Sequence, residues 1–317
     1  MCCLKAIFLC LIVVVKIQFC KPTSPTESPS DKSILLDFPD DTLQLILIGK
    51  RINNLKRGDI KGFKNLFDIE LCNNKIENIE PGTFDILPKL ERMNLSENSL
   101  TKVENGVFNN LNIRILDLSW NKISVIEETA LNDMPELTSL YLGNNEITKW
   151  NPNWFQRTPK LIRLVFEHNN LNSLPENAFQ NIESTRTDNK TDMCWLDFSY
   201  NQITELHPKT FAGVKYAEGI NFKNNSISDL PPGLFSSLEK TSLIWFWYNQ
   251  ITCLSDEFLE SLPPTLSDNI ELDFNPWNCS CVEKSHDWSK AHGKTLSVLI
   301  TYFDCVVDPL LKDGDAE

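Results

Sequence analysis

The residue types that most often perform acid–base or nucleophilic chemistry occur here without a supporting pattern. The chain has four histidines, His168, His207, His286 and His292. None lies beside a serine or cysteine in a recognisable nucleophile motif, and none is at zinc-ligand spacing from a cysteine pair. The sequence also has no P-loop, dinucleotide-binding glycine run or nucleophile elbow. We therefore expect no enzymatic activity, no cofactor and no metal site.

Aromatic side chains suggest a different chemistry, which is recognition of another macromolecule. The segment IWFWYN contains Trp245, Trp247 and Tyr248, and Trp195 and Tyr200 occur earlier in the chain at a similar place in the pattern. Exposed tryptophans and tyrosines on a rigid surface are typical of protein-binding hot spots. The alternative is that the cap, a glycan or the curvature of the fold covers these rings.

The elements that would position these rings come from an internal repeat. In IRILDLSWNKISVI, residues 113–126, apolar residues alternate around Asp117 with the period of a strand that buries one face. An asparagine follows, and this arrangement recurs. One such unit cannot bury its apolar edge alone, so copies must stack. The repeated asparagines are Asn74, Asn98, Asn121, Asn145, Asn169, Asn201, Asn225, Asn249 and Asn275.

The spacing of these asparagines predicts a solenoid of about ten coils. The steps are 24, 23, 24, 24, 32, 24, 24 and 26 residues, and an earlier unit has Lys50 at the asparagine position. Short strands from successive coils should pair in parallel at ~4.8 Å per coil. Each asparagine side chain should satisfy backbone groups in its own and neighbouring coils. A large apolar residue ten positions after each asparagine should form a second buried column.

This unit, L-x-x-L-x-L-x-x-N-x-I-x-x-I-x-x-G-x-F-x-x-L, resembles the typical 24-residue repeat of extracellular leucine-rich repeat proteins. The resemblance extends from about Pro39 to Cys305 and includes a partial cysteine-rich cap at the C-terminal end. It implies an α/β solenoid, a right-handed curved horseshoe with a parallel β-sheet on the concave side and irregular or short helical segments on the convex side. It also implies a binding module, because such proteins mostly recognise other molecules.

The outward-facing residues of the strands define the expected binding face. The middle position of each strand gives a column that includes Tyr141 and Trp245. We expect the partner-binding residues to be Tyr141, Trp195, Asp197, Asn221, Lys223, Trp245 and Trp247. A set of acids on this face could steer a basic partner, or could simply be solvated: Asp68, Glu70, Asp117, Asp197, Glu271 and Asp273. Asp117 and Asp197 lie three coils apart, ~14 Å, which is too far for a glycosidase pair.

Composition and the ends of the chain favour a secreted protein. Residues 1–20 have the positive start and apolar core of a signal peptide, and residues 21–33 are a Pro/Ser/Thr-rich tail expected to be disordered. We assign residues 34–274 to the solenoid, with an insertion near 183–192, and residues 275–317 to the cap. The net charge of −13 argues against nucleic acid as the partner. No membrane span is expected in the mature chain; a truncated receptor ectodomain is the alternative.

The cysteines give an incomplete disulfide framework. By resemblance to the family's cap, Cys305 should pair with Cys279 or Cys281. The remaining cysteine could bond to Cys253, stay free, or link two chains into an oligomer. Cys72 and Cys194 lie five coils apart, ~24 Å, so they cannot pair with each other. We expect both to be buried thiols that pack as small apolar groups.

Four Asn-x-Ser/Thr sequons agree with secretion: Asn94, Asn189, Asn224 and Asn278. Together these features predict a secreted, non-enzymatic module that binds a protein ligand on its concave face, in adhesion, signalling or innate defence. A second interpretation is a carrier or a non-catalytic subunit that stabilises or inhibits a secreted enzyme. An intermolecular disulfide from the cap would favour that second interpretation.

Overall fold

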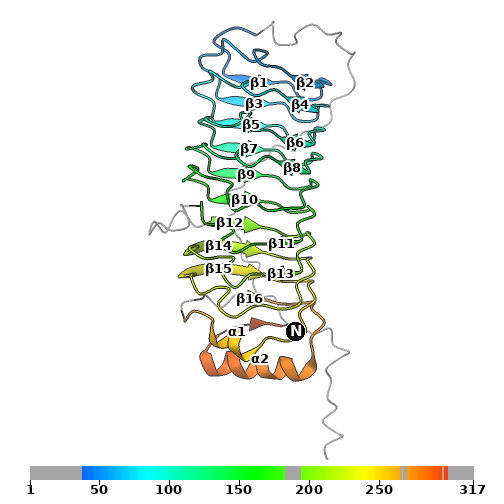
Figure 1. The fold of residues 1–317 in the computed structure, drawn as a ribbon, viewed down its shortest axis with the longest axis vertical. Helices are drawn as coiled ribbons and strands as arrows, with labels where there is room; N and C mark the ends of the chain where they lie inside the picture. The colour runs from blue at the N-terminus through cyan, green and yellow to red at the C-terminus, as the bar shows by residue number, and fades with distance from the viewer. Residues whose placement is uncertain (1–37, 183–193, 265, 267–269, 295, 299–317) are drawn as a thin grey trace, which may run out of the picture.

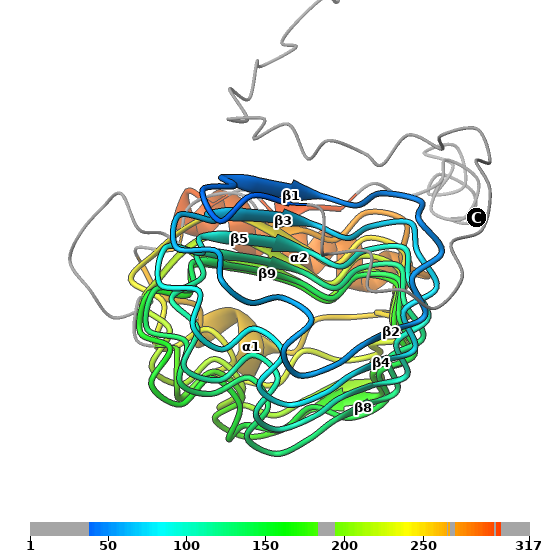
Figure 2. The ribbon, with the colours of Figure 1, turned by 90° about the horizontal axis from the view of Figure 1, so that it is seen from above.

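The computed structural model describes residues 38–182, 194–264, 266, 270–294 and 296–298. Within them the chain winds as a solenoid, and the predicted fold class is confirmed: parallel strands line one side and the return path has little helix (Figures 1 and 2). The predicted signal peptide, the tail, the insertion with its sequon at Asn189, and Cys305 lie outside these residues. The first strand begins at Gln44, and Phe38 and Pro39 are not in a strand.

One sheet contains eleven strands, each paired in parallel with its neighbours in the order β1-β3-β5-β7-β9-β10-β12-β14-β15-β16-β17. One strand comes from each coil, and the last strand, β17, lies within the predicted cap. The strands are β1 (Gln44–Ile46), β3 (Asp68–Glu70), β5 (Arg92–Asn94), β7 (Ile115–Asp117), β9 (Ser139–Tyr141), β10 (Arg163–Val165), β12 (Cys194–Asp197), β14 (Tyr216–Asn221), β15 (Lys240–Trp245), β16 (Ile270–Glu271) and β17 (Leu296–Ser297).

The return path of each coil contains only short elements. Three two-stranded parallel sheets form there from β2 (Asn54–Leu55) with β4 (Asn78–Ile79), β6 (Lys102–Val103) with β8 (Val125–Ile126), and β11 (Ser173–Leu174) with β13 (Glu205–Leu206). Helix α1 (Asp256–Glu260) and helix α2 (Cys279–His292) both lie at the C-terminal end (Figure 1). Among the described residues, no helix is long and apolar enough to cross a membrane.

The core lies between the sheet and the return path. The predicted column after the asparagines is buried, and Phe179, Phe211 and Phe235 stack with ring centroids 5.4 and 5.7 Å apart. A second column of phenylalanines comes from the strand ends and stacks at 5.9, 5.6 and 5.5 Å: Phe166, Phe198, Phe222 and Phe246. Such stacking adds specific aromatic contacts to the apolar burial that holds neighbouring coils together.

Each asparagine of the repeat joins neighbouring coils through its buried side chain. Asn145 donates to the carbonyls of Leu118 at 3.0 Å, Leu142 at 3.0 Å and Gly143 at 3.2 Å. Its Oδ1 accepts a hydrogen bond from the backbone N–H of Ile123 at 3.0 Å. The same pattern occurs at Asn74, Asn98 and Asn121 and continues to Asn275. The asparagine is therefore required by the backbone geometry of the turn at the end of each strand.

The residue just before each of these asparagines has a left-handed backbone. Its φ lies between 52° and 59° at Asn73, Glu97, Trp120, Asn144, His168, Tyr200, Asn224, Tyr248 and Phe274. Asparagine tolerates this region well, whereas bulky side chains rarely adopt it. We call this position the exit position, because the chain leaves the sheet there.

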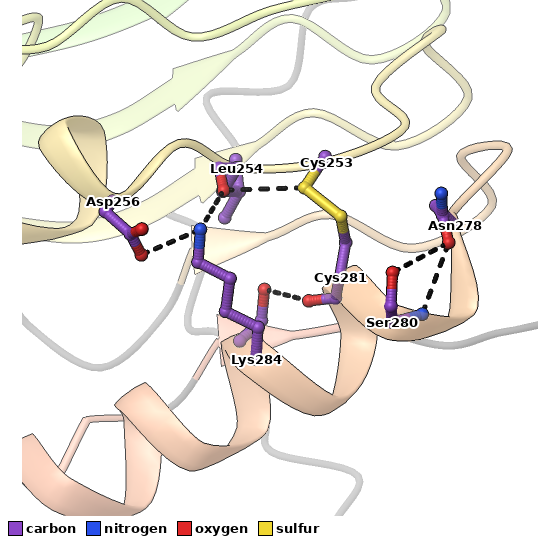
Figure 3. The surroundings of a disulfide bond; sticks show 8 residues. Cys253, Leu254, Asp256, Asn278, Ser280, Cys281 and Lys284 are labelled. Carbon is purple, nitrogen blue, oxygen red and sulfur yellow. Dashed lines mark hydrogen bonds and ion pairs between the residues drawn. A yellow bond between two sulfur atoms is a disulfide. The ribbon is translucent and has the colours of Figure 1, made fainter.

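The C-terminal end is closed by α2 and a disulfide (Figure 3). Asn278 caps the helix by accepting a hydrogen bond from the N–H of Ser280. Cys281, in the first turn, bonds to Cys253 of the preceding coil. Lys284 bridges to the same coil through Asp256 at 2.7 Å and the Leu254 carbonyl at 3.5 Å. The cap is thus attached covalently and by an ion pair.

The remaining described cysteines require one correction. Cys194 is a buried free thiol, as expected, and its burial raises its pKa to about 12. Cys72 is also fully buried, but it is disulfide-bonded, so the prediction of a free thiol there is wrong. Cys279 is disulfide-bonded as well. Coil counting excluded only a Cys72–Cys194 bond and gave no information about other partners for Cys72.

Candidate functional site

The pairing register places the predicted outward column in one continuous row. Tyr141 pairs with Val165, Val165 with Asp197, Asp197 with Asn221, Asn221 with Trp245, and Trp245 with Glu271. We call the outward side of the eleven-stranded sheet the sheet face. Because successive strands pair without insertion at this position, residues 24, 26 or 32 apart in sequence become direct neighbours.

Trp195 and Trp245 form the centre of the sheet face in the C-terminal half. Their ring centroids lie 5.5 Å apart with the planes at 69°, an edge-to-face contact. Between their strands lies Gly219, which pairs with Trp195. A Cβ placed on Gly219 would be 2.6 Å from the Trp195 ring, so the glycine makes room for the indole to lie across β14. The neighbouring coil therefore determines the position of Trp195.

Charged groups hold the two ends of this tryptophan pair. The Arg163 guanidinium lies 5.6 Å from the Trp195 ring centroid, within the range of a cation–π contact. At the other end, the Trp245 side chain makes a hydrogen bond with the Glu271 carboxyl; burial raises the pKa of that carboxyl and this bond opposes the rise. The order Arg163, Trp195, Trp245, Glu271 is thus a preorganised row across five strands.

Asn221 and Lys223 lie next to this row. Asn221 donates from Nδ2 to Asp197 Oδ2 at 3.0 Å and accepts the N–H of Lys223 on Oδ1. The Lys223 ammonium lies 5.7 Å from the Tyr200 ring centroid, 5.7 Å from that of Trp247 and 5.8 Å from that of Tyr248. Six of the seven predicted binding residues therefore gather on β12, β14 and β15 and the turns after β14 and β15.

Tyr141 is the seventh predicted binding residue and lies apart from this group. It is half-buried on β9, with β10 between it and β12. Burial raises the pKa of its phenol, and the Arg163 guanidinium opposes this rise. Tyr141 thus borders the group through Arg163, on the side away from Trp245.

The predicted acidic strip is largely structural. Asp117 and Asp197 are buried, and each accepts hydrogen bonds from the N–H and hydroxyl of the serine two residues later, Ser119 or Ser199. Asp273 accepts the hydroxyl of Ser297 at 3.0 Å. Burial raises the pKa of Asp117, and the Ser119 bonds oppose that rise. These carboxylates brace the sheet and are poorly placed to steer a partner.

The first acids of the strip are also engaged. Asp68 is buried and forms an ion pair with Arg92 at 2.8 Å. Glu70 accepts a hydrogen bond from Asn94 at 2.8 Å, and its pKa is raised by burial and by the nearby Asp68 carboxylate. The Asn94 amide nitrogen, where a glycan would attach, is therefore already used. The sequons at Asn224 and Asn278 lie at an exit position and at the helix cap.

Sequence reasoning missed three features of the site. The Asp-x-Ser pairs were visible in the sequence and show how the buried Asp117 and Asp197 carboxylates are hydrogen-bonded. Gly219 was visible, but its role depends on a tryptophan 24 residues earlier. The third is the left-handed backbone of the exit position; Tyr200 and Tyr248 were expected from the sequence, but this conformation was not. It places exposed aromatic rings along one edge of the sheet: Trp120, His168, Tyr200, Tyr248 and Phe274.

Other surface features offer weaker support for a binding site. An open hollow of about 570 Å³ near the start of the early strands has a mixed lining that includes Phe67, Lys89, Arg114 and Glu136. Within the described ranges, no group of three or more His, Cys, Asp or Glu side chains could hold a metal ion. The aromatic part of the sheet face therefore remains the best candidate site.

Comparison with known proteins agrees with this architecture. The family model described as "Leucine rich repeat" matches residues 44–100, 88–147, 135–187 and 191–251. A solved structure described as "Crystal structure of TLR13-ssRNA13 complex" superposes with a TM-score of 0.63 at 22% identity, covering 74% of this chain and 34% of that one. A search of curated proteins finds no match.

A second solved structure is the "Octameric complex of Latrophilin 3 (Lec, Olf), Unc5D (Ig, Ig2, TSP1) and FLRT2 (LRR)". It superposes with a TM-score of 0.59 at 23% identity, covering 74% of this chain and 70% of that one. The present chain thus spans about a third of the length of the first structure and more than two thirds of the second. At these identities the likeness shows the fold alone.

Proposed function

Because the chain belongs to the leucine-rich repeat family, we propose that it is an extracellular protein-binding module with no enzymatic activity of its own. The docking surface in this proposal is the C-terminal half of the sheet face, centred on Trp195 and Trp245. The biological setting would be adhesion, signalling or innate defence. Membership of the family supports a general role in recognition. The geometry of the two tryptophans supports the proposed location of the binding surface.

The observation that supports this location most directly is the tryptophan pair over Gly219. Two half-buried indoles are fixed in an edge-to-face contact, with Arg163 at one end and Glu271 at the other. Rigid aromatic side chains lose little conformational entropy on binding, so they contribute affinity efficiently. Asn221 and Lys223 add hydrogen-bonding and charged groups beside them.

Charge favours a protein over a nucleic acid as the partner. The chain has 43 acidic and 30 basic residues, a net charge of −13, which would repel a phosphate backbone. One of the two similar structures is a complex with an RNA, ssRNA13, and the other is a complex of proteins. For the present chain, the acidic balance supports the second kind of partner.

The described cap cysteines give no support to the alternative of a disulfide-linked carrier or enzyme subunit. That interpretation depended on an unpaired cap cysteine, yet Cys253 bonds to Cys281 and Cys279 is also disulfide-bonded. A receptor ectodomain remains compatible with the same binding surface, because it would use the sheet face in the same way.

The test begins with proximity capture in the native source, followed by affinity measurement on the purified partner. We expect Trp195→Ala and Trp245→Ala each to weaken binding by about 2 kcal/mol, roughly 30-fold. Gly219→Ala should weaken it similarly, because the new Cβ displaces the Trp195 ring. Val125→Ala, an exposed apolar residue on β8, is the matched control. Unchanged affinity in folded Trp195, Trp245 and Gly219 variants would refute the proposed site.

A further inference from the structure

The exit positions of successive coils lie in a row along one edge of the sheet, which we call the exit edge. This edge carries more aromatic surface than the fold requires. At the exit position the backbone is left-handed in nine coils, and three of these have asparagine there. Five others have an exposed aromatic ring instead, including Trp120, which is 60% exposed, and Tyr200, which is 40% exposed. Bulky side chains are disfavoured in this backbone region. Because asparagine serves the same turn in other coils, the rings are not needed to form it.

These rings are arranged as stacked pairs separated by two gaps. His168 stacks on Tyr200 with centroids 4.1 Å apart, and Tyr248 stacks on Phe274 at 4.6 Å. One gap lies between the pairs, at the coil of Asn224. The other lies between Trp120 and His168, at the coil of Asn144. In both gaps a small exit residue replaces a ring.

Lys223 occupies the first gap. Its ammonium lies nearly equidistant from the Tyr200, Trp247 and Tyr248 rings, at 5.7, 5.7 and 5.8 Å. Within the described part of the chain it forms no salt bridge with a carboxylate. The lysine is half-buried, so it presents a positioned positive charge at the edge without a neutralising partner.

A carboxylate occupies the second gap. The residue before Asn144 is Gly143, and a Cβ there would lie 2.9 Å from Cγ and 3.4 Å from Oε1 of Glu167. The Glu167 side chain therefore folds back over the glycine, into the coil between Trp120 and His168. Among the described residues its carboxylate has no hydrogen-bond or salt-bridge partner. The edge thus displays one unpaired negative and one unpaired positive group.

The distance between the two charged groups suggests what binds them. Gly143 and Lys223 belong to coils three steps apart, ~14 Å at parallel-strand spacing. An extended peptide advances ~3.3 Å per residue and turns alternate side chains to one face, so residues i and i+4 lie ~13 Å apart on the same face. Residue i+2 would then lie over the His168–Tyr200 stack.

We propose that the exit edge binds an extended segment of a partner protein with the pattern basic-x-apolar-x-acidic, or its reverse. The basic side chain pairs with Glu167 beside the Trp120 ring. The apolar side chain contacts the edges of His168 and Tyr200. The acidic side chain pairs with Lys223. This inference rests on the proposed function, to which it adds the chemistry of the partner, and it extends the binding surface from the sheet face to the neighbouring edge.

The experiment uses two labelled synthetic peptides and NMR titration of the intact protein. The probe is acetyl-Gly-Lys-Ser-Phe-Ser-Glu-Gly-amide, and the spacing control places lysine and glutamate only two positions apart. We expect the probe to shift the amide signals of His168, Tyr200 and Lys223. The control peptide should bind at least fivefold more weakly, because its charges span only ~7 Å.

Charge reversal provides the decisive comparison. Glu167→Lys and Lys223→Glu should each weaken the probe at least fivefold, since each leaves two like charges on the edge. The double variant Glu167→Lys/Lys223→Glu should recover affinity to within twofold, because the peptide can bind in the opposite direction. Glu205→Lys, on the exposed strand β13, changes the net charge equally and should have no effect.

The outcomes separate this inference from the proposed function. Absence of probe binding at millimolar concentration, or failure of the double variant to recover affinity, would overturn the inference. Loss of partner affinity in the Trp195 and Trp245 variants would still support the sheet-face site in that case. Conversely, charge-dependent probe binding with unaffected partner affinity in those variants would support the edge and refute the sheet-face site.

Discussion

Replacing Asn145 with alanine tests the structural role of the repeated asparagine. The three carbonyls that accept its Nδ2 protons each have another donor: Asn121 at Leu118, Asn169 at Leu142 and the Trp120 N–H at Gly143. The N–H of Ile123 has no other acceptor within the described residues. The variant therefore leaves one buried donor unpaired and removes several shared bonds.

The expected cost follows from this count. An orphaned buried donor costs about 1–3 kcal/mol, and each shared bond contributes less because its carbonyl stays paired. We predict a loss of about 2–3 kcal/mol in the free energy of unfolding, which lowers Tm by about 4–12 °C for a domain of this size. Denaturant titration followed by circular dichroism measures it. Glu146→Ala, an exposed neighbour, is the control. A change no larger than that of the control would show that Ile123 finds another acceptor.

Three further predictions concern the cap and the buried ionisable groups. Replacing Cys253 and Cys281 by serine should lower stability by about 3–4 kcal/mol, because the bond closes a loop of 28 residues; an unchanged unfolding midpoint would contradict this. The Cys194 thiol, buried with a pKa of about 12, should react with iodoacetamide at pH 8 at least 100-fold more slowly than after unfolding, as measured by mass spectrometry of its peptide. The raised pKa of Asp117 implies that its contribution to stability is greatest below pH ~4 and falls as pH rises through its folded-state pKa. The gain in Tm of the Asp117→Asn variant over the unsubstituted protein should therefore be larger at pH 7 than at pH 3.5. An equal effect at both pH values would show that Asp117 ionises as freely in the folded state as in the unfolded chain.

The periodic part of the fold was predictable because every coil is subject to the same constraint. Each inward leucine or isoleucine and each asparagine has the same neighbours in every coil, so the strand register follows from counting. Counting residues along the repeat thus predicts that Asn221 pairs with Trp245 and that Trp245 pairs with Glu271. The fold class and the family were confirmed on that basis.

The features that were missed depend on contacts between unlike residues of different coils. The Trp195 ring lies where it does because the next coil has Gly219, and no period predicts that combination. Asp197 is buried because Ser199 supplies two hydrogen bonds from the same strand end. Cys72 is disulfide-bonded, a state that the spacing of the coils did not predict. Such pairwise contacts decide which outward residues remain available to a ligand.

Site-specific photo-cross-linking tests the central claim that the sheet face binds a protein. A photoreactive phenylalanine analogue would replace Asn221, which pairs with Asp197 on one side and Trp245 on the other, or Thr204, an exposed residue of the return path. After irradiation in the native protein mixture, we predict a defined protein adduct from position 221 and none from position 204. Adducts from position 204 alone, or equal adducts from both positions, would contradict the claim.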